Sequence, residues 1–235
     1  ELEGHRDIIS MVSPRVGYSE TLEAVGGLKI DIPFSFYGLH LADSDTTAAI
    51  AANAWTAEEN LLAFRAMCRA VQHLHAKYVV HRDLKPDNFL VMADGSVKLA
   101  DFGTARKLDD ATPPLNRSYD APPGDLRYVS PEMLANLHDE DARIAFSADL
   151  FSLGAVLFEM FTGSILTFHI YETGFRASLV NVMTAVSKGR RRRLFDQFVN
   201  DISDARPLPH IGDFGTAVPP CIRDRLDDLY RRLAA

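Results

Sequence analysis

The sequence contains few cysteines and no long run of apolar residues. Its two cysteines, Cys68 and Cys221, stand far apart and outside any C-x-x-C pattern, so no disulfide framework is predicted. Such cysteine usage is typical of a reducing compartment, and we expect a cytoplasmic location. Apolar runs such as residues 153–158 are much shorter than the roughly 18 residues that cross a bilayer, so we expect no membrane segment. The first residues also lack the basic and apolar stretches of a signal peptide.

An excess of basic residues is lacking as well. The chain of 235 residues carries 25 lysines and arginines against 32 aspartates and glutamates, which gives a net charge of −7. A general nucleic-acid binder needs a basic face that pairs with phosphates, so we expect no nucleic-acid partner. With 47% hydrophobic and 24% charged residues, the chain has enough apolar side chains to bury a core. Its length corresponds to one or two domains.

Short strand-like segments dominate the first 40 residues. Residues 8–12 are predicted to form a strand, and Gly26-Gly27 is a turn signal. In residues 28–32 apolar side chains alternate with polar ones, which predicts a half-buried strand. Residues 34–41 indicate another extended segment.

The pattern becomes mainly helical from about residue 44. Thr56 and Glu59 have the spacing of a capping box, and apolar residues then recur every three or four positions as far as His75. Cys68 lies on this stripe, which favours a small apolar core residue over a reactive thiol. Further helices are predicted at residues 147–161, with Ser147 as the cap and Gly163 as the stop, at 175–186, at 194–202 and from 221 to the end.

A predicted hairpin brings two polar segments together. The strand-like runs 89–92 and 97–100 flank Asp94-Gly95, which is a common tight-turn signal. The hairpin joins the loop of residues 81–88 to Asp101, so we expect the Asp101 side chain to return beside that loop.

Four side chains around this hairpin have the chemistry that phosphoryl transfer needs. Asn88 and Asp101 offer hard oxygen ligands, which suit Mg²⁺. Asp83 offers a carboxylate that can orient a hydroxyl and accept its proton, and Lys85 offers a positive charge for a transferring phosphoryl group. Because phosphoryl transfer depends mainly on positioning and charge neutralisation, this set predicts a phosphoryl-transfer site.

The order of these residues resembles the signature of the eukaryotic-type protein kinases. The stretch His81-Arg82-Asp83-Leu84-Lys85-Pro86-Asp87-Asn88 is similar to their catalytic loop, H-R-D-x-K-x-x-N, and Asp101-Phe102-Gly103 is similar to their D-F-G motif. Ser130-Pro131-Glu132 resembles the A-P-E motif that closes the activation segment. Asp149 to Gly154 resembles the D-x-W-S-L-G start of a long buried helix.

The resemblance covers roughly residues 5–235 and implies an α+β, protein kinase-like fold. Residues 1–38 would form a partial, strand-rich small lobe, and residues 39–235 the large, mainly helical catalytic lobe. Small-molecule kinases of related fold typically have H-G-D in place of H-R-D. Lys85 follows Asp83 by two residues, as in serine/threonine kinases. The implied activity is therefore transfer of the ATP γ-phosphate to a Ser or Thr hydroxyl of a protein substrate, with Mg²⁺ as cofactor.

The resemblance also implies a role for each residue of the loop and hairpin. Asp83 would be the catalytic base, and Lys85 would contact the γ-phosphate of ATP. Asn88 and Asp101 would hold Mg²⁺ in the ATP site, where Leu90 would lie under the adenine.

Further residues would support this site. His81 and Phe102 would stack in a hydrophobic spine, and Asp149 would hold the backbone of the catalytic loop. Arg82 would pair with a phosphate on the activation segment, although an unmodified loop hydroxyl is the alternative at each candidate position. The candidate acceptors of that phosphate are Thr112, Ser118 and Tyr119.

Several elements of the family are not found in the sequence. Residues 5–9 resemble the H-P-N-I-V segment that follows a glutamate-bearing helix, yet no Gly-rich loop and no strand lysine precede them. Lys29 and Gly26-Gly27 come too late in the order to replace them, and Glu1 and Glu3 lie too close to His5 to be the helix glutamate. We therefore expect a kinase domain truncated at both ends, with weak or no activity on its own.

Three charged features depart from the family pattern. In Gly124-Asp125-Leu126-Arg127-Tyr128 an aspartate replaces the usual threonine, and its charge would repel Asp83 unless Lys85 or Arg127 neutralises it. Glu132 would lack the arginine that usually pairs with it, and a buried unpaired charge is costly. Because of Asp125 and the missing N-terminal elements, a pseudokinase-like scaffold is the alternative function. The run 188–193 is either a dock for an acidic partner or the solvated start of a helix.

Overall fold

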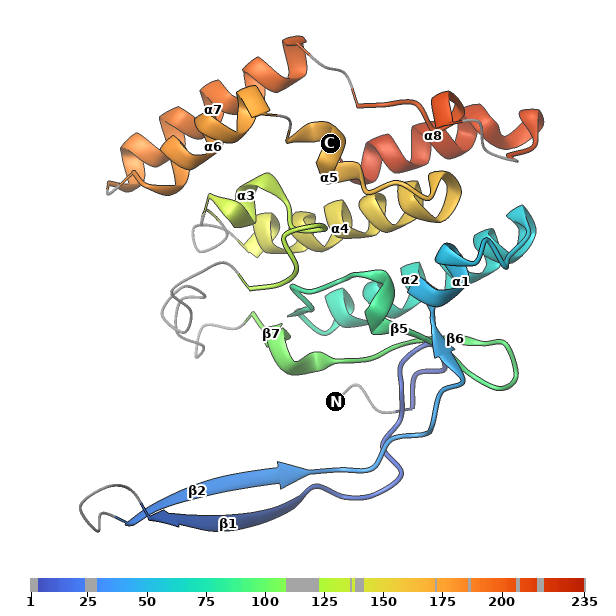
Figure 1. The fold of residues 1–235 in the computed structure, drawn as a ribbon, viewed down its shortest axis with the longest axis vertical. Coiled ribbons are helices and arrows are strands. Elements are labelled where there is room, and N and C mark those ends of the chain that lie inside the picture. The colour runs from blue at the N-terminus through green and yellow to red at the C-terminus, as the bar shows by residue number, and fades with distance from the viewer. Residues whose placement is uncertain are drawn as a thin grey trace.

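The computed structural model describes residues 4–23, 29–108, 123–135, 137, 142–171, 173–185, 187–205, 208–214 and 218–234. A strand-rich N-terminal part adjoins a larger helical part (Figure 1). The helices are α1 (Thr46–Ala51), α2 (Ala57–Ala76), α3 (Pro131–Leu134), α4 (Ala142–Thr162), α5 (Leu166–Ile170), α6 (Thr173–Met183), α7 (Lys188–Ala205) and α8 (Pro220–Ala234). The strands are β1 (Val16–Glu23), β2 (Lys29–Phe36), β3 (Ser44–Asp45), β4 (Val79–Val80), β5 (Phe89–Val91), β6 (Val97–Leu99) and β7 (Arg106–Lys107).

Some of the predicted features fall outside the described residues. They are Glu1, Glu3, Gly26-Gly27 and the three candidate phosphate acceptors Thr112, Ser118 and Tyr119. The division of the chain after residue 38 stays a prediction.

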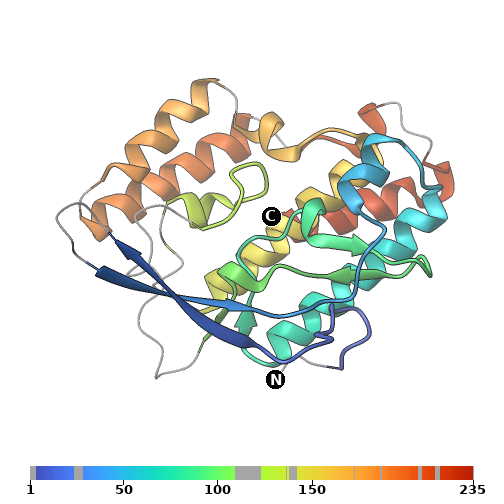
Figure 2. The same ribbon diagram turned by 60° about the horizontal axis from the view of Figure 1, so that its bottom comes forward.

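Strands β1 and β2 form an antiparallel ribbon that lies apart from the helices in Figure 1 and runs across the front of the molecule in Figure 2. Its register runs from Val16 opposite Phe36 to Glu23 opposite Lys29. The predicted strand near residues 28–32 is therefore present, but the prediction that it is half-buried is wrong, because most of the ribbon is exposed on both faces. The separate extended segment predicted from residue 34 is also wrong in part, since residues 34–36 continue β2.

The segment predicted as a strand at residues 8–12 makes only isolated bridges. Ile8 bridges to Leu99 of β6, and Met11 bridges to Leu39. The segment is nevertheless fixed, because the side chain of Arg69 on α2 donates to both carboxylate oxygens of Asp7, at 2.7 and 2.8 Å. It therefore packs beside β6 without forming a continuous strand.

Helix α2 begins and packs as the sequence predicts. Thr56 Oγ1 accepts from the backbone N–H of Glu59 at 3.2 Å, and Glu59 accepts from the backbone N–H of Thr56 at 2.8 Å, which completes the capping box. On the predicted stripe Phe64 and Val71 are buried in the main core and Cys68 is half-buried. Met67 and Leu74, which lie outside that stripe, are buried beside them. Burial raises the pKa of Cys68 to about 11, as expected for a core thiol that is not reactive.

Helix α4 lies between α2 and α8 and forms the centre of the helical part (Figure 1). It begins at Ala142, so the prediction that Ser147 caps it is wrong, since Ser147 lies inside the helix. The predicted stop is confirmed, because Gly163 adopts a φ of 66° and donates to the Glu159 carbonyl at 2.7 Å. At Gly154 a Cβ atom would lie 3.0 Å from Cβ of Leu233, so glycine there permits the close approach of α8.

The same helix is the one described segment that is long and apolar enough to cross a membrane. Its length and apolar character were not predicted from the sequence, because single polar residues interrupt its apolar runs. Within Arg143–Thr162, however, 72% of the apolar window is buried inside the protein. A core helix passes the same test of length and composition, and the burial accounts for the apolar character of α4.

Helices α6 and α7 pack together and cover a second apolar cluster that includes Met133, Leu179 and Phe198. Both were predicted, although α7 begins earlier than expected, at Lys188. The basic run therefore forms the first turns of α7, where Arg190, Arg192 and Arg193 are exposed. This is the solvated helix start named above, and docking of an acidic partner there stays a prediction.

Candidate active site

The catalytic-loop segment is anchored to α4 through its backbone. The carboxylate of Asp149, which is 1% exposed, accepts hydrogen bonds from the backbone N–H groups of His81 and Arg82, both at 2.9 Å. The ring Nε2 of His75 lies 2.9 Å from the same carboxylate. Asp149 thus holds the loop from the core, as the family resemblance implies. A buried carboxylate is stable only with such partners.

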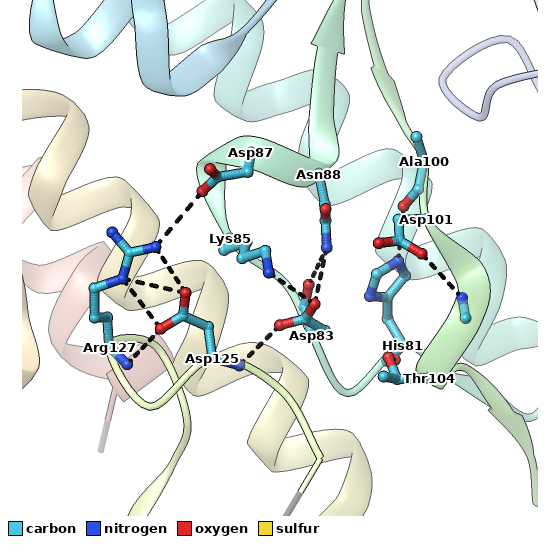
Figure 3. Close-up of polar contacts among 11 residues, drawn as sticks. His81, Asp83, Lys85, Asp87, Asn88, Ala100, Asp101, Thr104, Asp125 and Arg127 are labelled. Carbon is cyan, nitrogen blue, oxygen red and sulfur yellow. Dashed lines mark hydrogen bonds and ion pairs between the residues drawn. The ribbon is translucent and has the colours of Figure 1, made fainter.

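The side chain of Asp83 is held by three donors (Figure 3). Its Oδ2 accepts from Nζ of Lys85 at 3.0 Å and from Nδ2 of Asn88 at 3.2 Å, and its Oδ1 accepts from the backbone N–H of Asp125 at 2.9 Å. Burial acts to lower the pKa of Lys85, but the hydrogen bond and charge of Asp83 outweigh it and raise the pKa, so Lys85 remains a cation. The structure therefore brings together Asp83, Lys85 and Asn88, which are three of the four predicted site residues.

The predicted hairpin folds back as expected. In β5 and β6, Phe89 lies opposite Leu99, and the backbone N–H of Ala100 donates to the Asn88 carbonyl at 2.9 Å. The turn closes through Gly95, whose φ is 77°. Asp101 follows Ala100 directly, so this pairing places it beside Asn88 (Figure 3). Asp101, the fourth predicted site residue, therefore belongs to the same site.

Asn88 and Asp101 have oxygen atoms that fit a divalent cation. Asn88 uses Nδ2 for both of its side-chain hydrogen bonds, to the carbonyl and the carboxylate of Asp83, which leaves Oδ1 as a possible ligand. Asp101 is exposed, adopts a left-handed φ of 54°, and accepts from the Gly103 N–H at 3.2 Å. Mg²⁺ commonly takes one or two protein oxygens and completes its shell with water and phosphate, so this donor set suits it. No group of three or more His, Cys, Asp or Glu that could hold a metal is found among the described residues.

The D-F-G segment is tied to the catalytic loop by ring and backbone contacts. The rings of His81 and Phe102 meet edge to face, with centroids 5.3 Å apart. Burial lowers the pKa of His81, whose Nε2 lies 3.1 Å from the Ala100 carbonyl. Thr104 donates to the His81 carbonyl at 2.9 Å, and Arg82 donates to the Thr104 carbonyl at 2.6 Å. The ring contact implied by the resemblance is present.

Leu90 lies in the middle of β5 and is half-buried. It pairs with Asp45 of β3 on one side and with Lys98 of β6 on the other. A nucleotide site at this position stays a prediction.

Asp125 is neutralised by Arg127, one of the two partners that the sequence suggested. Nη2 of Arg127 lies 2.7 Å from Oδ2 of Asp125, and Nε lies 3.1 Å from both carboxylate oxygens. Burial acts to raise the pKa of Asp125, but the hydrogen bonds and charge of Arg127 outweigh it and lower the pKa. The aspartate therefore stays ionised as the partner of Arg127, and its carboxylate is not left to repel Asp83.

The charge of Glu132 costs less stability than the sequence suggested, because the side chain is not fully buried. Its side chain is half-buried, and no ion pair to it is found in the described part of the chain. A half-exposed carboxylate can be solvated by water, so the cost of an uncompensated buried charge does not apply in full.

Sequence reasoning missed two carboxylates near the loop. Asp87 lies 4.0 Å from Nη2 of Arg127, and Glu159 of α4 accepts from the hydroxyl of Tyr128 at 2.6 Å. Burial raises the pKa of both Glu159 and Tyr128. A signal for Glu159 was available, since it is an isolated acidic residue within an apolar helical run.

Comparison with known proteins agrees with this geometry. The sequence pattern of the protein kinase domain family matches residues 41–206. The chain belongs to this family. Its α+β fold and its loop and hairpin are those of part of a protein kinase domain.

Several protein kinases are similar to the chain over part of its length. Serine/threonine-protein kinase MRCK beta of Homo sapiens is 34% identical over 140 residues, which are 59% of this chain and 8% of that protein. A probable cell division protein kinase of Encephalitozoon cuniculi (strain GB-M1) is 44% identical over 92 residues, which are 39% of this chain and 32% of that protein. Serine/threonine-protein kinase RUNKEL of Arabidopsis thaliana is 39% identical over 94 residues, which are 40% of this chain and 6% of that protein. The chain thus spans a small part of these relatives.

Proposed function

We propose that this protein kinase domain transfers the γ-phosphate of ATP to serine or threonine hydroxyls of a protein substrate. The observation that carries the proposal is the Asp83 carboxylate, which three donors hold beside Asn88 and the end of β6. A carboxylate in this position is oriented before substrate binds, which is what positioning catalysis requires.

In this proposal each residue has a separate task. Asp83 orients the substrate hydroxyl and accepts its proton, while the hydroxyl oxygen forms a bond to the γ-phosphorus. The bond between that phosphorus and the bridging oxygen of ATP breaks, and ADP leaves with the electron pair. Lys85, 3.0 Å from Asp83, neutralises charge on the transferring group.

Asn88 and Asp101 are the residues that would hold Mg²⁺. When bound, the ion supplies neutralisation of the phosphate charge. Leu90, half-buried between β3 and β6, would lie under the adenine of ATP.

The choice of serine or threonine over tyrosine rests on Lys85. It follows Asp83 by two residues and pairs with its carboxylate at 3.0 Å. Two of the relatives described above are named as serine/threonine kinases. The activity of these 235 residues by themselves is proposed to be weak, because they include no Gly-rich loop and strand lysine in the order that the family has.

The test is phosphate transfer from radiolabelled ATP to a generic protein substrate. It uses the longest natural protein that contains these residues, alongside the 235-residue chain. We expect Asp101→Asn to lower the rate in the longer protein at least a hundredfold, roughly the effect of removing one charge-stabilising group. Asp94→Asn is the matched control, because Asp94 lies in the turn of the same hairpin and is exposed.

A longer protein that is inert, and in which Asp101→Asn changes nothing, would favour the pseudokinase-like scaffold. Robust transfer by the 235-residue chain alone would contradict its proposed weak activity.

A further inference from the structure

An arginine lies among carboxylates beside the catalytic loop. The guanidinium of Arg127 makes a two-point contact with Asp125 and lies 4.0 Å from Oδ2 of Asp87 (Figure 3). Its Cζ also lies 5.5 Å from the centre of the Tyr128 ring, whose hydroxyl donates to Glu159. Asp87 of the catalytic loop and Asp125 thus flank one arginine, and Glu159 of α4 lies next to it through the hydroxyl of Tyr128.

Without that arginine the cluster would attract a basic side chain. The side chain of Asp87 is 43% exposed, so its carboxylate is open to a ligand from solvent. Asp125 is partly buried and would lose its hydrogen-bonding partner, which leaves a charge that favours a replacement cation. The binding preference of such a cluster is a guanidinium or ammonium group.

A peptide that reaches Asp83 must pass close to this cluster. The backbone N–H of Asp125 is hydrogen-bonded to the carboxylate of Asp83, which is the proposed proton acceptor. The Arg127–Asp125 pair therefore lies directly beside that carboxylate. An extended peptide advances about 3.4 Å per residue. Side chains within about three residues of the acceptor hydroxyl are therefore in reach of Asp87 and Arg127.

We propose that Arg127 determines substrate specificity by occupying the position among Asp87, Asp125 and Glu159 that a basic residue of the substrate would otherwise take. The inference rests on the proposed function, because it assigns the substrate class of the same site. It predicts that a basic residue near the serine or threonine of a peptide adds little to the affinity of the unaltered enzyme. Removal of Arg127 should create a preference for such a basic residue.

Exposure of Arg127 distinguishes this role from simple neutralisation of Asp125. One edge of the guanidinium, Nε and Nη2, bonds to Asp125, while 43% of the side chain remains exposed beside Asp87. A purely structural partner of Asp125 would affect stability alone. A residue that occupies a substrate subsite would change the ratio of affinities for different peptides.

The experiment measures binding of fluorescent peptides by anisotropy without ATP, in the same longest natural protein. Each peptide has one serine and either Arg or Gln at one of three positions on either side of it. In the unaltered protein we expect the two affinities to agree within about twofold at every position. With Arg127→Gln we expect the Arg peptide to bind about fivefold more tightly at one or more positions, the scale of a half-exposed ion pair.

Two further variants make the result specific. Asp87→Asn combined with Arg127→Gln should remove most of the gain, because the exposed carboxylate is then absent. Arg192→Gln is the matched control, since it removes one positive charge from an exposed arginine that pairs with exposed Asp196 on the same helix, and it should change no ratio. Arg127→Lys should give an intermediate ratio, because lysine keeps the charge but has no two-point fork. This variant decides the matter if Arg127→Gln does not fold.

The inference is overturned if the ratio of Arg to Gln peptide affinities is the same in the unaltered protein, Arg127→Gln and Arg127→Lys. Phosphate transfer to the same peptides separates this failure from that of the proposed function. A changed ratio without any transfer refutes the kinase activity and leaves the subsite intact. Transfer with an unchanged ratio refutes the subsite alone.

Discussion

The backbone N–H of Asp125 donates a 2.9 Å hydrogen bond to Oδ1 of Asp83. This bond joins the segment after the D-F-G region to the proposed catalytic base. Because the donor is a backbone group, the contact does not depend on which side chain stands at position 125. That explains how an aspartate can replace the threonine usual in the family, provided that Arg127 neutralises it.

Gly124 fixes the approach of this segment to the catalytic loop. It has a φ of 98°, and a Cβ atom there would lie 2.4 Å from the carbonyl oxygen of Arg82. We expect Gly124→Ala to cost about 2 kcal/mol or more of unfolding free energy and to displace the Asp125 N–H from Asp83. Urea denaturation and phosphate transfer measure the two effects.

Gly95→Ala is the control for that substitution. Gly95 also has a positive φ, 77°, but a Cβ atom would meet nothing within 4 Å. It should therefore cost only the backbone penalty of about 1 kcal/mol and leave transfer unchanged. Equal losses of activity in the two variants would show that the close approach at Gly124 is unimportant.

Asp149 links the stability of the core to the shape of the catalytic loop. In Asp149→Asn an NH₂ group replaces one acceptor oxygen, so one buried backbone N–H, of His81 or Arg82, faces a donor. We expect a loss of about 2 kcal/mol of stability, together with a large fall in phosphate transfer.

Asp227→Asn provides the comparison for Asp149. Asp227 is also buried and accepts from a backbone N–H, that of Ile211 at 2.9 Å, but it lies on α8. Its substitution should lower stability to a similar degree with no change in the transfer rate measured at low temperature. If both variants lose the same fraction of activity, Asp149 acts only through global stability.

The Asp7–Arg69 pair predicts a pH dependence of stability. Hydrogen bonds from Arg69 hold the pKa of Asp7 below its ordinary value of 3.8, so the folded state favours the ionised carboxylate. This stabilisation is fully present above pH 3.8 and is lost as the pH falls through the lower folded pKa. Asp7→Asn should therefore lower unfolding free energy by about 2 kcal/mol at pH 7.

The difference between Asp7→Asn and the unaltered protein should stay constant from pH 7 to pH 5 and shrink below about pH 3.8. Denaturation at a series of pH values measures it. Arg65→Gln on the exposed face of α2 is the control and should show no such trend. A difference that grows as the pH falls would contradict the assigned pair.

The catalytic hairpin was predictable because its signals are local. Asp94-Gly95 specifies the turn, and the strand-like runs on both sides specify the pairing that returns Asp101 to Asn88. The alternation in residues 28–32 likewise predicted a strand. It did not predict exposure, because burial depends on what packs against a strand and not on its own pattern.

Contacts between distant or irregular positions could not be predicted. Tyr128 and Glu159 are 31 residues apart, and no periodicity relates a loop tyrosine to a helix glutamate. The Asp125–Arg127 pair lies in an irregular loop, so the sequence left both Lys85 and Arg127 as possible partners of Asp125. The structure shows that Arg127 makes the ion pair. The start of α4 was missed because Ser147 looks like a cap, whereas the helix extends five residues further toward the N-terminus.

The central claim is that Asn88 and Asp101 share one divalent ion beside Asp83. Electron paramagnetic resonance of Mn²⁺ titrated with ATP into the longest natural protein measures this directly, because bound and free Mn²⁺ give different signals. We expect Asn88→Ala and Asp101→Asn each to weaken Mn²⁺ binding at least about tenfold. Asp94→Asn is the control and should leave the Mn²⁺ affinity unchanged. Binding of Mn²⁺ with unchanged affinity in both Asn88→Ala and Asp101→Asn would contradict the account.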